Sequence, residues 1–181
     1  MKKVLSAVAL SAMLLGPAVI WAQSTPTTAT SVTAVAELSP TKGNTVHGEV
    51  KFVQMNGYVL VTAHVEGLTP GKHGFHIHAV GDCSAADGSS AGGHFNPTNQ
   101  QHGGPNAKIR HEGDLGNLTA NAQGVADYSR KDKVVQLSGD NSIIGKGMIV
   151  HGGVDDYKTQ PTGNAGARVA CGVIQVWHDN K

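Results

Sequence analysis

Residues 46–66 read VHGEVKFVQMNGYVLVTAHVE, and this stretch decides the fold class of the chain. Apolar and polar residues alternate over 46–52 and again over 59–66, which puts one face of each strand in a core and the other in water. The Met-Asn-Gly tripeptide at 55–57 separates the two runs and has the composition of a turn. The stretch therefore predicts two neighbouring strands and favours an all-β fold.

Shorter runs of the same kind occur along the rest of the chain, whereas no long segment keeps the 3.6-residue period of a helix. These further strands are predicted at 73–78, 114–120, 124–129, 147–150 and 170–177. With 24 glycines and frequent turns, the pattern predicts an all-β domain that is either a sandwich or a barrel. The stretches 81–113 and 152–167 lack alternation, and we expect them to be two long functional loops.

The N-terminal residues have the layout of a secretory signal peptide. Lys2 and Lys3 precede an apolar run over 4–15, a Gly-Pro pair breaks the run, and cleavage is expected after Ala22. The alternative is an uncleaved membrane anchor, for which the run is near the required length but is interrupted by serines. The predicted organisation is a signal peptide over 1–22, a Ser/Thr-rich flexible leader over 23–34 and one domain over 35–181.

The predicted mature chain is nearly neutral and contains one pair of cysteines. Without Lys2 and Lys3 it has 12 basic and 13 acidic residues, so it lacks the basic excess expected of a protein that binds nucleic acid or an anionic membrane. Cys83 and Cys171 are the two cysteines, and in an exported protein such a pair is expected to form a disulfide. Two buried free thiols are the alternative.

Ten histidines are present, and four of them are expected to have no ligand role. His47 and His64 occupy polar positions of their strands and should be solvated. His178 lies in the C-terminal tail. His73 follows a turn, where a structural histidine is expected. The other six histidines, together with one aspartate, are candidate metal ligands.

One set of candidates belongs to predicted strands. His76 and His78 lie two residues apart, so both side chains leave the same strand face, while Phe75 and Ile77 leave the other. His151 ends an apolar run and could project from a strand end. Two histidines on a strand are a weak signal alone, because chance histidines on a polar face have the same spacing.

A second set lies in or directly after the loop 81–113. It comprises His94, His102, His111 and Asp114. Three imidazoles and one carboxylate suit tetrahedral zinc, whereas the all-imidazole strand set suits copper. Two four-coordinate ions need eight donors and the candidates number seven, so one imidazole using both ring nitrogens would complete the sets. His94 is nearest to the strand pair in sequence and is the natural bridge, an inference that the spacing does not prove.

Seven segments together resemble the copper/zinc superoxide dismutase family. They are GFHIHAVGD, SAGGHFNP, HGGP, RHEGDLGNLTA, GVADYS, LSGDNSIIGKGMIVH and TGNAGARVACGVI, and the resemblance runs from about Glu37 to Val176. It implies a Greek-key β-sandwich or flattened barrel. It also implies a dismutase that converts two superoxide anions to oxygen and hydrogen peroxide, with one copper and one zinc in each subunit.

The resemblance assigns roles to the matching positions. The implied copper ligands are His76, His78, His94 and His151. The implied zinc ligands are His94, His102, His111 and Asp114, with His94 bridging the two ions. Asp155 is implied to accept hydrogen bonds from one histidine on each metal. Arg168 beside the copper and the bridging His94 are implied as the catalytic residues, and Thr162 as a residue that narrows the approach channel. Cys83 and Cys171 match the family disulfide.

Two departures bear on location and on substrate approach. Cys83 directly follows Gly81 and Asp82, an early position that resembles exported bacterial forms, so we expect a periplasmic protein. The loop 152–167 is shorter than in the animal enzymes and offers Lys158 and Pro161 where those enzymes have an acidic pair.

Superoxide is the expected partner, and a homodimer is a further expectation, whose interface the sequence leaves open. No nucleic acid is expected as a partner, and no membrane after signal cleavage. One alternative is a copper- and zinc-binding or delivery protein without turnover, which would be expected to lack the arginine, the bridge or the fourth copper ligand. Another is zinc-dependent hydrolysis, which would need an open zinc position.

Overall fold

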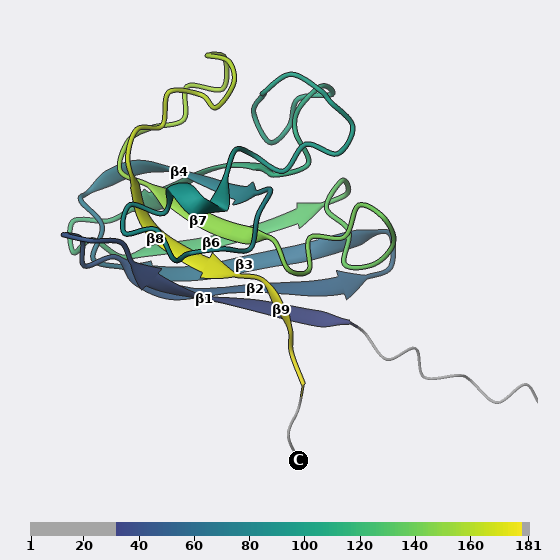
Figure 1. Ribbon diagram of the computed structural model, residues 1–181, viewed down its shortest axis with the longest axis horizontal. Helices are drawn as coiled ribbons and strands as arrows, with labels where there is room; N and C mark the ends of the chain where they lie inside the picture. The colour runs from purple at the N-terminus through teal and green to yellow at the C-terminus, as the bar shows by residue number, and fades with distance from the viewer. Residues whose placement is uncertain (1–31, 179–181) are drawn as a thin grey trace, which may run out of the picture.

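The computed structural model describes residues 32–178 (Figure 1). The strands are β1 (Thr33–Pro40), β2 (His47–Met55), β3 (Tyr58–Glu66), β4 (Gly71–His78), β5 (Asp114–Ala120), β6 (Ala126–Asp132), β7 (Gly147–His151), β8 (Arg168–Val173) and β9 (Gln175–Val176). Within these described residues a single 3-10 turn, η1 (Ser89–Ala91), accompanies the strands. Within this described range no helix has the length and apolar character needed to cross a membrane. The expected signal peptide and most of the expected leader lie outside the described residues, and Thr33 and Ala34 at the end of that leader begin β1.

The strands form one antiparallel sheet that curls into a nearly closed barrel. Its order is β5-β4-β7-β8-β1-β2-β3-β6, with β9 paired to β1. The connections from β3 to β4 and from β6 to β7 pass between sheet positions that are not neighbours, as in a Greek key. The edge strands β5 and β6 approach each other where the Tyr128 hydroxyl donates to the Leu115 carbonyl at 2.8 Å. The predicted all-β Greek-key architecture is confirmed.

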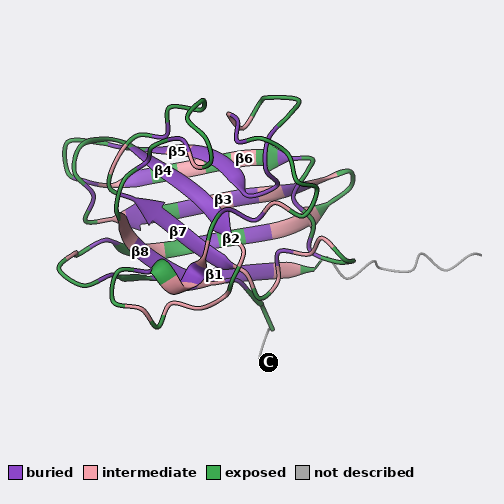
Figure 2. Cartoon of the chain, turned by 45° about the horizontal axis from the view of Figure 1, so that its top comes forward, coloured by how far each residue is buried: buried purple, intermediate pink, exposed green. Residues whose placement is uncertain are grey.

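The hairpin predicted from residues 46–66 is formed by β2 and β3. Their register runs from His47 opposite Glu66 to Met55 opposite Tyr58, and Gly57 takes a φ of +83°, a turn conformation that favours glycine. Val50 and Val61 are among the apolar side chains that face the core, whereas the polar side chains between them face solvent. Figure 2 shows this division between buried and exposed positions along the strands.

The core fills the barrel with branched aliphatic and aromatic side chains. Its largest fully buried members are Phe52, Phe75, Ile77, Leu115, Leu118, Ile143, Met148 and Ile174. Burying one such side chain contributes about 1.5–3 kcal/mol. Phe75 and Ile77 of β4 belong to this core, so the histidines that alternate with them leave the opposite face of the strand.

Several strand boundaries differ from those expected by one to three residues, and the larger differences have physical reasons. β1 was not among the expected strands. β6 begins at Ala126 rather than at residue 124, because Val125 bonds back to Asn121 through its carbonyl and its amide and so belongs to the turn. The expected last strand is divided into β8 and β9 at Ile174, whose backbone bonds to residues 145 and 146 instead.

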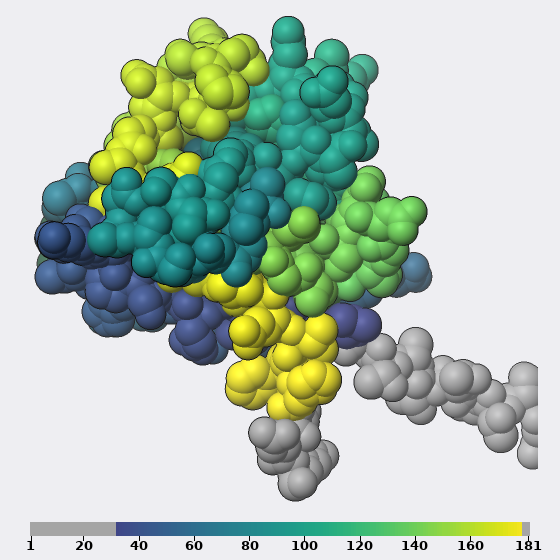
Figure 3. Space-filling model, in the orientation of Figure 1, coloured from purple at the N-terminus to yellow at the C-terminus, as the bar shows by residue number. Residues whose placement is uncertain are grey.

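Two long loops lie at one end of the barrel, over 79–113 and 152–167 (Figure 1). The first of them is tied to β8 by the disulfide between Cys83 and Cys171, so the expected pairing is present. A cross-link between residues 88 positions apart stabilises a fold by about 4–5 kcal/mol on the chain-entropy account. The space-filling view shows the two loops in contact above the sheet (Figure 3).

Candidate metal centre

The strands β4 and β7 present three histidines toward the loop end of the barrel. His76 and His78 come from β4, where a bulge between Gly74 and His76 shifts the register with β5. His151 ends β7 at a second irregularity, directly after Val150. Bulges re-aim side chains at sheet edges, and here both lie beside the histidines. All three imidazoles are buried.

These three histidines and His94 form the first of two groups, which we call the four-histidine group. One ring nitrogen from each of the four lies within 4.8 Å of the others. The opposite nitrogens of three rings are held by acceptors: His78 Nδ1 by the Gly92 carbonyl at 2.8 Å, His151 Nδ1 by the Gly166 carbonyl at 3.1 Å, and His76 Nε2 by Asp155 Oδ2 at 2.8 Å. A proton on each of these outer nitrogens leaves the inner nitrogens with free lone pairs, as a metal ligand requires.

The second group contains three histidines and one carboxylate, and we call it the His3Asp group. Its members are His94, His102, His111 and Asp114, with donor atoms again within 4.8 Å of one another. Asp114 Oδ1 lies 2.7 Å from His94 Nδ1, 3.0 Å from His102 Nδ1 and 3.2 Å from His111 Nδ1. Its Oδ2 accepts the backbone amides of Gly103 and His111, which fixes the carboxylate.

His94 belongs to both groups through different ring nitrogens. Its Nδ1 faces Asp114, while its Nε2 is buried and makes no hydrogen bond in the described part of the chain. The His94 ring centroid lies 4.2 Å from that of His76 and 5.1 Å from that of His78. Seven side chains therefore supply eight donor atoms, the number that the sequence predicted for a shared imidazole.

The donor sets fit copper and zinc. Within residues 32–178, the buried nitrogens His76 Nδ1 and His94 Nε2 lack hydrogen-bond partners, which is costly unless an ion binds there. Four imidazoles suit copper, and three imidazoles with a carboxylate suit tetrahedral zinc. Burial lowers the pKa of His94 to about 4 and that of His151 to about 3, so both rings are neutral and able to ligate near neutral pH.

Charge is distributed differently in the His3Asp group. Burial opposes protonation of His102, but hydrogen bonds to Asp114 and Asp155 outweigh it and raise the His102 pKa to about 9. Burial would raise the pKa of both carboxyls, and the surrounding imidazoles instead hold each pKa well below its usual range. Without an ion, a protonated His102 balances these carboxylates, and an ion would take the place of its Nδ1 proton.

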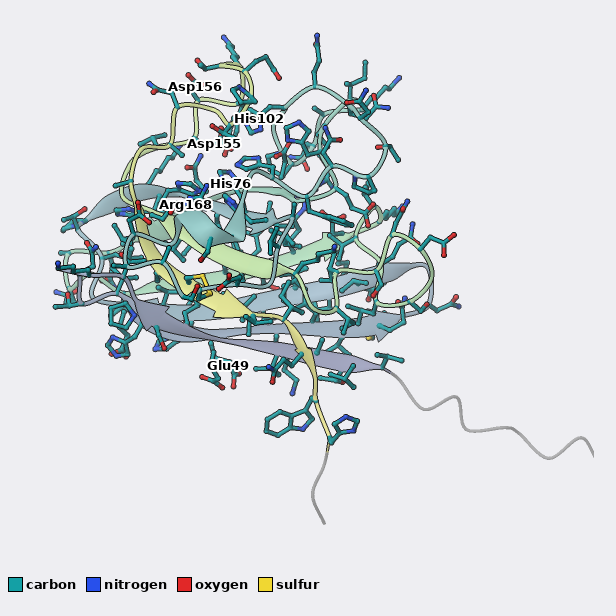
Figure 4. The ribbon with its side chains drawn as sticks, viewed as in Figure 1. Glu49, His76, His102, Asp155, Asp156 and Arg168 are labelled. Carbon is teal, nitrogen blue, oxygen red and sulfur yellow. A yellow bond between two sulfur atoms is a disulfide. The ribbon has the colours of Figure 1, made fainter. Side chains whose placement is uncertain are left out.

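Asp155 connects the two groups. Its Oδ2 accepts from His76 Nε2 and its Oδ1 from His102 Nε2, both at 2.8 Å, so one carboxylate orients a ring in each group. The sticks of Figure 4 show Asp155 between His102 and His76, at the base of the loop, while its neighbour Asp156 lies farther out. Asn117 of β5 holds the Asp155 backbone at both ends, accepting from its amide at 2.8 Å and donating to its carbonyl at 3.0 Å.

Arg168 supplies a fixed cation beside the four-histidine group. Its guanidinium donates to the Gly88 carbonyl at 2.7 Å and to the Gly92 carbonyl at 2.6 Å. Gly92 also accepts from His78, so one short backbone segment places both the arginine and a ring of the group. Burial lowers the pKa of Arg168 from its ordinary value, and nearby Asp87 opposes this shift, so the side chain stays charged near neutral pH. Thr162 is half-buried in the same loop end.

Sequence reasoning missed a buried arginine that supports the His3Asp group. Arg110 Nη1 donates to the carbonyls of His111, Glu112 and Asp114, and its Nη2 makes two bonds to Asp132 at 2.7 and 2.8 Å. Both partners of this ion pair are buried. A charged residue directly before a candidate ligand was the available signal, but its partner lies 22 positions away with no pattern connecting them.

The remaining histidines lie where the sequence predicted. His47, His64 and His178 are exposed. His73 is buried, with its Nδ1 2.9 Å from the carbonyl of His151 and its Nε2 2.8 Å from that of Thr69, which is a structural role. It supports the backbone of a candidate ligand without facing either group.

Comparison with known proteins gives one family. The chain matches the family model described as copper/zinc superoxide dismutase (SODC) over residues 46–174. It is similar to the extracellular Cu-Zn superoxide dismutase of Brugia pahangi, with 45% identity over 155 residues that cover 81% of this chain and 77% of that protein. It is also 47% identical over 157 residues to the Cu-Zn superoxide dismutase of Onchocerca volvulus, covering 81% of this chain and 97% of that protein. Both relatives come from nematodes, so the likeness to bacterial forms stays a prediction.

Proposed function

Since the chain belongs to the copper/zinc superoxide dismutase family and is a superoxide dismutase, we propose that the four-histidine group holds its copper and the His3Asp group its zinc. The reaction converts two superoxide anions to dioxygen and hydrogen peroxide. The observation that carries the proposal is His94, whose two ring nitrogens face the two groups. A shared imidazole explains how seven residues complete two four-donor sites.

The chemistry divides between the bound ions and the residues around them. Bound copper supplies the one-electron exchange that alternately oxidises and reduces superoxide, and zinc, which has no redox chemistry, supplies a fixed charge and a closed structural site. Arg168 attracts and docks the anionic substrate, because its guanidinium is held beside the four-histidine group by two carbonyls. Thr162 narrows the approach.

His94 also handles a proton. The reaction consumes two protons for each peroxide formed, and His94 Nε2 is a buried nitrogen that makes no hydrogen bond in the described chain. We propose that this atom takes up one proton and returns it to the reduced substrate. His94 Nδ1 lies 2.7 Å from Asp114 on the other side of the ring, where zinc would bind, so the zinc site would keep the orientation of the imidazole while the proton moves.

The two alternatives from the sequence find less support in the geometry. Zinc-dependent hydrolysis needs an open coordination position and a general base, but the His3Asp group already converges four donors. A binding or delivery protein without turnover would have no use for a cation fixed beside the copper group, and Arg168 is fixed there by two short bonds.

Export and assembly are further parts of the proposal. The disulfide and the extracellular relative support an exported protein, and we propose the periplasm as its compartment.

We also propose that two copies of the chain associate as a homodimer through the face formed by β1, β8 and β9. This face contains a groove lined by Val35 and Val173, and it exposes Val176 and Trp177, the latter with 51% of its surface accessible. Sedimentation of the native chain and of the Val176→Glu variant tests the proposed dimer. The native chain should sediment as a dimer and the variant as a monomer, and a native chain that is a monomer would refute the proposal.

The function is tested with purified protein loaded with copper and zinc. We expect superoxide removal that slows as ionic strength rises, because salt screens the attraction between Arg168 and the anion. The Arg168→Ala variant should retain both metals and lose about 10- to 100-fold in rate, the lower part of the roughly 10- to 1000-fold range ascribed to electrostatic steering. A native protein that binds both ions without removing superoxide would overturn the proposal and favour the delivery protein.

A further inference from the structure

The loop 152–167 reaches the His3Asp group through a side chain that is neither a candidate ligand nor part of the proposed catalytic set. Gln160 Oε1 accepts the backbone amide of His102 at 2.8 Å, and Gln160 Nε2 donates to the His102 carbonyl at 3.0 Å. The primary amide thus pairs with both backbone groups of one residue, as a neighbouring strand would. Such two-point pairing fixes orientation as well as distance.

His102 is consequently held at three places by the same loop. Asp155 accepts a hydrogen bond from the His102 ring, and Gln160 pairs with the His102 backbone. Gly163 packs against the hydrogen bond between Asp155 and the His102 ring. A Cβ at Gly163 would fall on Asp155 Oδ1 and lie 2.6 Å from His102 Nε2, so no larger residue fits while this contact exists. The loop and the zinc-site histidine therefore form one packed unit.

Gln160 also lies in the segment 158–163, which we call the channel mouth because it contains Thr162, the residue expected to narrow the approach channel. Pro161 and Thr162 follow it, and the loop closes on itself where the Gly163 amide donates to the Thr159 carbonyl at 2.7 Å. Asp155 at the start of this segment has a second anchor in Asn117 of β5, but in the described residues the 158–162 portion bonds to the neighbouring loop through Gln160 alone. The position of the channel mouth thus depends on His102.

We propose that Gln160 is a positioning residue that couples zinc binding at His102 to the order of the channel mouth at 158–163. The proposal rests on the zinc-site assignment made above. Zinc fixes the ring of His102, the fixed residue holds the Gln160 amide, and the amide holds Pro161 and Thr162. In the other direction, the amide slows the departure of His102 and therefore of zinc. Removing a residue that orients a metal ligand typically lowers metal affinity by about 10- to 100-fold. The two bonds of Gln160 are uncharged and only partly buried, so we expect their loss to have an effect at or below the lower end of that range.

The test compares Gln160→Met with Gln100→Met in the copper- and zinc-loaded protein. Methionine keeps the length of glutamine and removes its hydrogen bonds. Gln100 is a matched control, because it lies in the same loop as His102 and its side-chain amide bonds locally to the Thr98 carbonyl. Two quantities are measured: the rate of zinc transfer to a chromogenic chelator, and amide hydrogen exchange over 153–163 with and without zinc.

We expect Gln160→Met to lose zinc about 3- to 10-fold faster than the native protein, with Gln100→Met unchanged. Zinc should slow exchange over 158–163 in the native chain and in the control, but not in Gln160→Met, while 153–156 stays protected in all three. Equal zinc loss in the two variants, or zinc-dependent protection of 158–163 that survives in Gln160→Met, would overturn the inference. A native chain that takes up no zinc would instead overturn the zinc-site assignment, and the inference with it.

Discussion

Replacing Asp155 with alanine should weaken zinc binding more than copper binding. The carboxylate is 1% exposed and accepts from His76 Nε2 and His102 Nε2, both at 2.8 Å. Alanine leaves both ring N–H groups buried without an acceptor, so each ring loses the contact that keeps its other nitrogen available to the metal. Both sites are affected by one substitution, but not equally.

The asymmetry follows from what remains at each site. In the four-histidine group, His78 and His151 keep their carbonyl partners at 2.8 and 3.1 Å. In the His3Asp group, His102 loses the acceptor of its outer nitrogen. Loss of such outer partners costs about 10- to 100-fold in metal affinity, so we expect about 10-fold for copper and about 100-fold for zinc.

Competition titrations with chelators of known affinity measure both constants on the same variant. Asp156→Ala is the matched control, because Asp156 is the next residue and bonds only to Lys158 and Thr159 of its own loop. The control should change neither constant appreciably. Weaker binding of copper alone in Asp155→Ala, or native values of both constants, would contradict this role of Asp155.

Three more perturbations have expected outcomes. Arg168→Lys should keep the steering charge but lose the two carbonyl anchors. Its rate of superoxide removal should therefore fall between those of the native protein and Arg168→Ala. A rate as low as that of Arg168→Ala would contradict this expectation, because it would mean that the charge alone does not speed the reaction. Arg110→Ala breaks a buried pair with Asp132 and should lower the free energy of unfolding by about 3–5 kcal/mol in urea titrations, whereas a change below about 1 kcal/mol would contradict a supporting role. The metal-free protein should lose stability as pH falls below 6.5, because burial lowers the folded-state pKa of His76 and His78, and that of His94 and His151 to about 4 and about 3, so the unfolded chain binds protons first. The raised pKa values of His102 and Glu112 act in the opposite direction, but the four buried histidines outnumber them. Urea midpoints at about pH 7.5 and pH 5 check the sign, and equal midpoints would contradict it.

The architecture followed from the sequence where burial is one-sided. The strands β2 and β3 alternate valine and phenylalanine with charged residues, and a face that must be buried leaves no choice of register. β1 gave no such signal, because its inward positions include Ala34 and Ala36 and it adjoins a Ser/Thr-rich stretch. Its pairing with β2 and β8, and not its own composition, makes it a strand.

The candidate ligands were predictable for a different reason. His76 and His78 are two residues apart on a strand, and the histidines and the aspartate of the later segment supply most of the other donors that two four-coordinate ions need. Residues that hold the ligands were not predictable in this way. Asn117, Gln160 and Arg110 bond to groups 38, 58 and 22 positions away, and a hydrogen bond between distant loops leaves no period or motif in the sequence. Only the folded barrel brings them together.

The central claim is that two metal sites share His94, and anomalous diffraction from the copper- and zinc-loaded protein tests it most directly. Data collected at the copper and zinc absorption edges locate each ion separately. We expect copper bound by the four-histidine group, zinc bound by the His3Asp group, and the His94 ring between them with Nε2 toward copper and Nδ1 toward zinc. An ion outside these groups, or a His94 ring that contacts neither or only one of the two ions in every copper oxidation state examined, would contradict it.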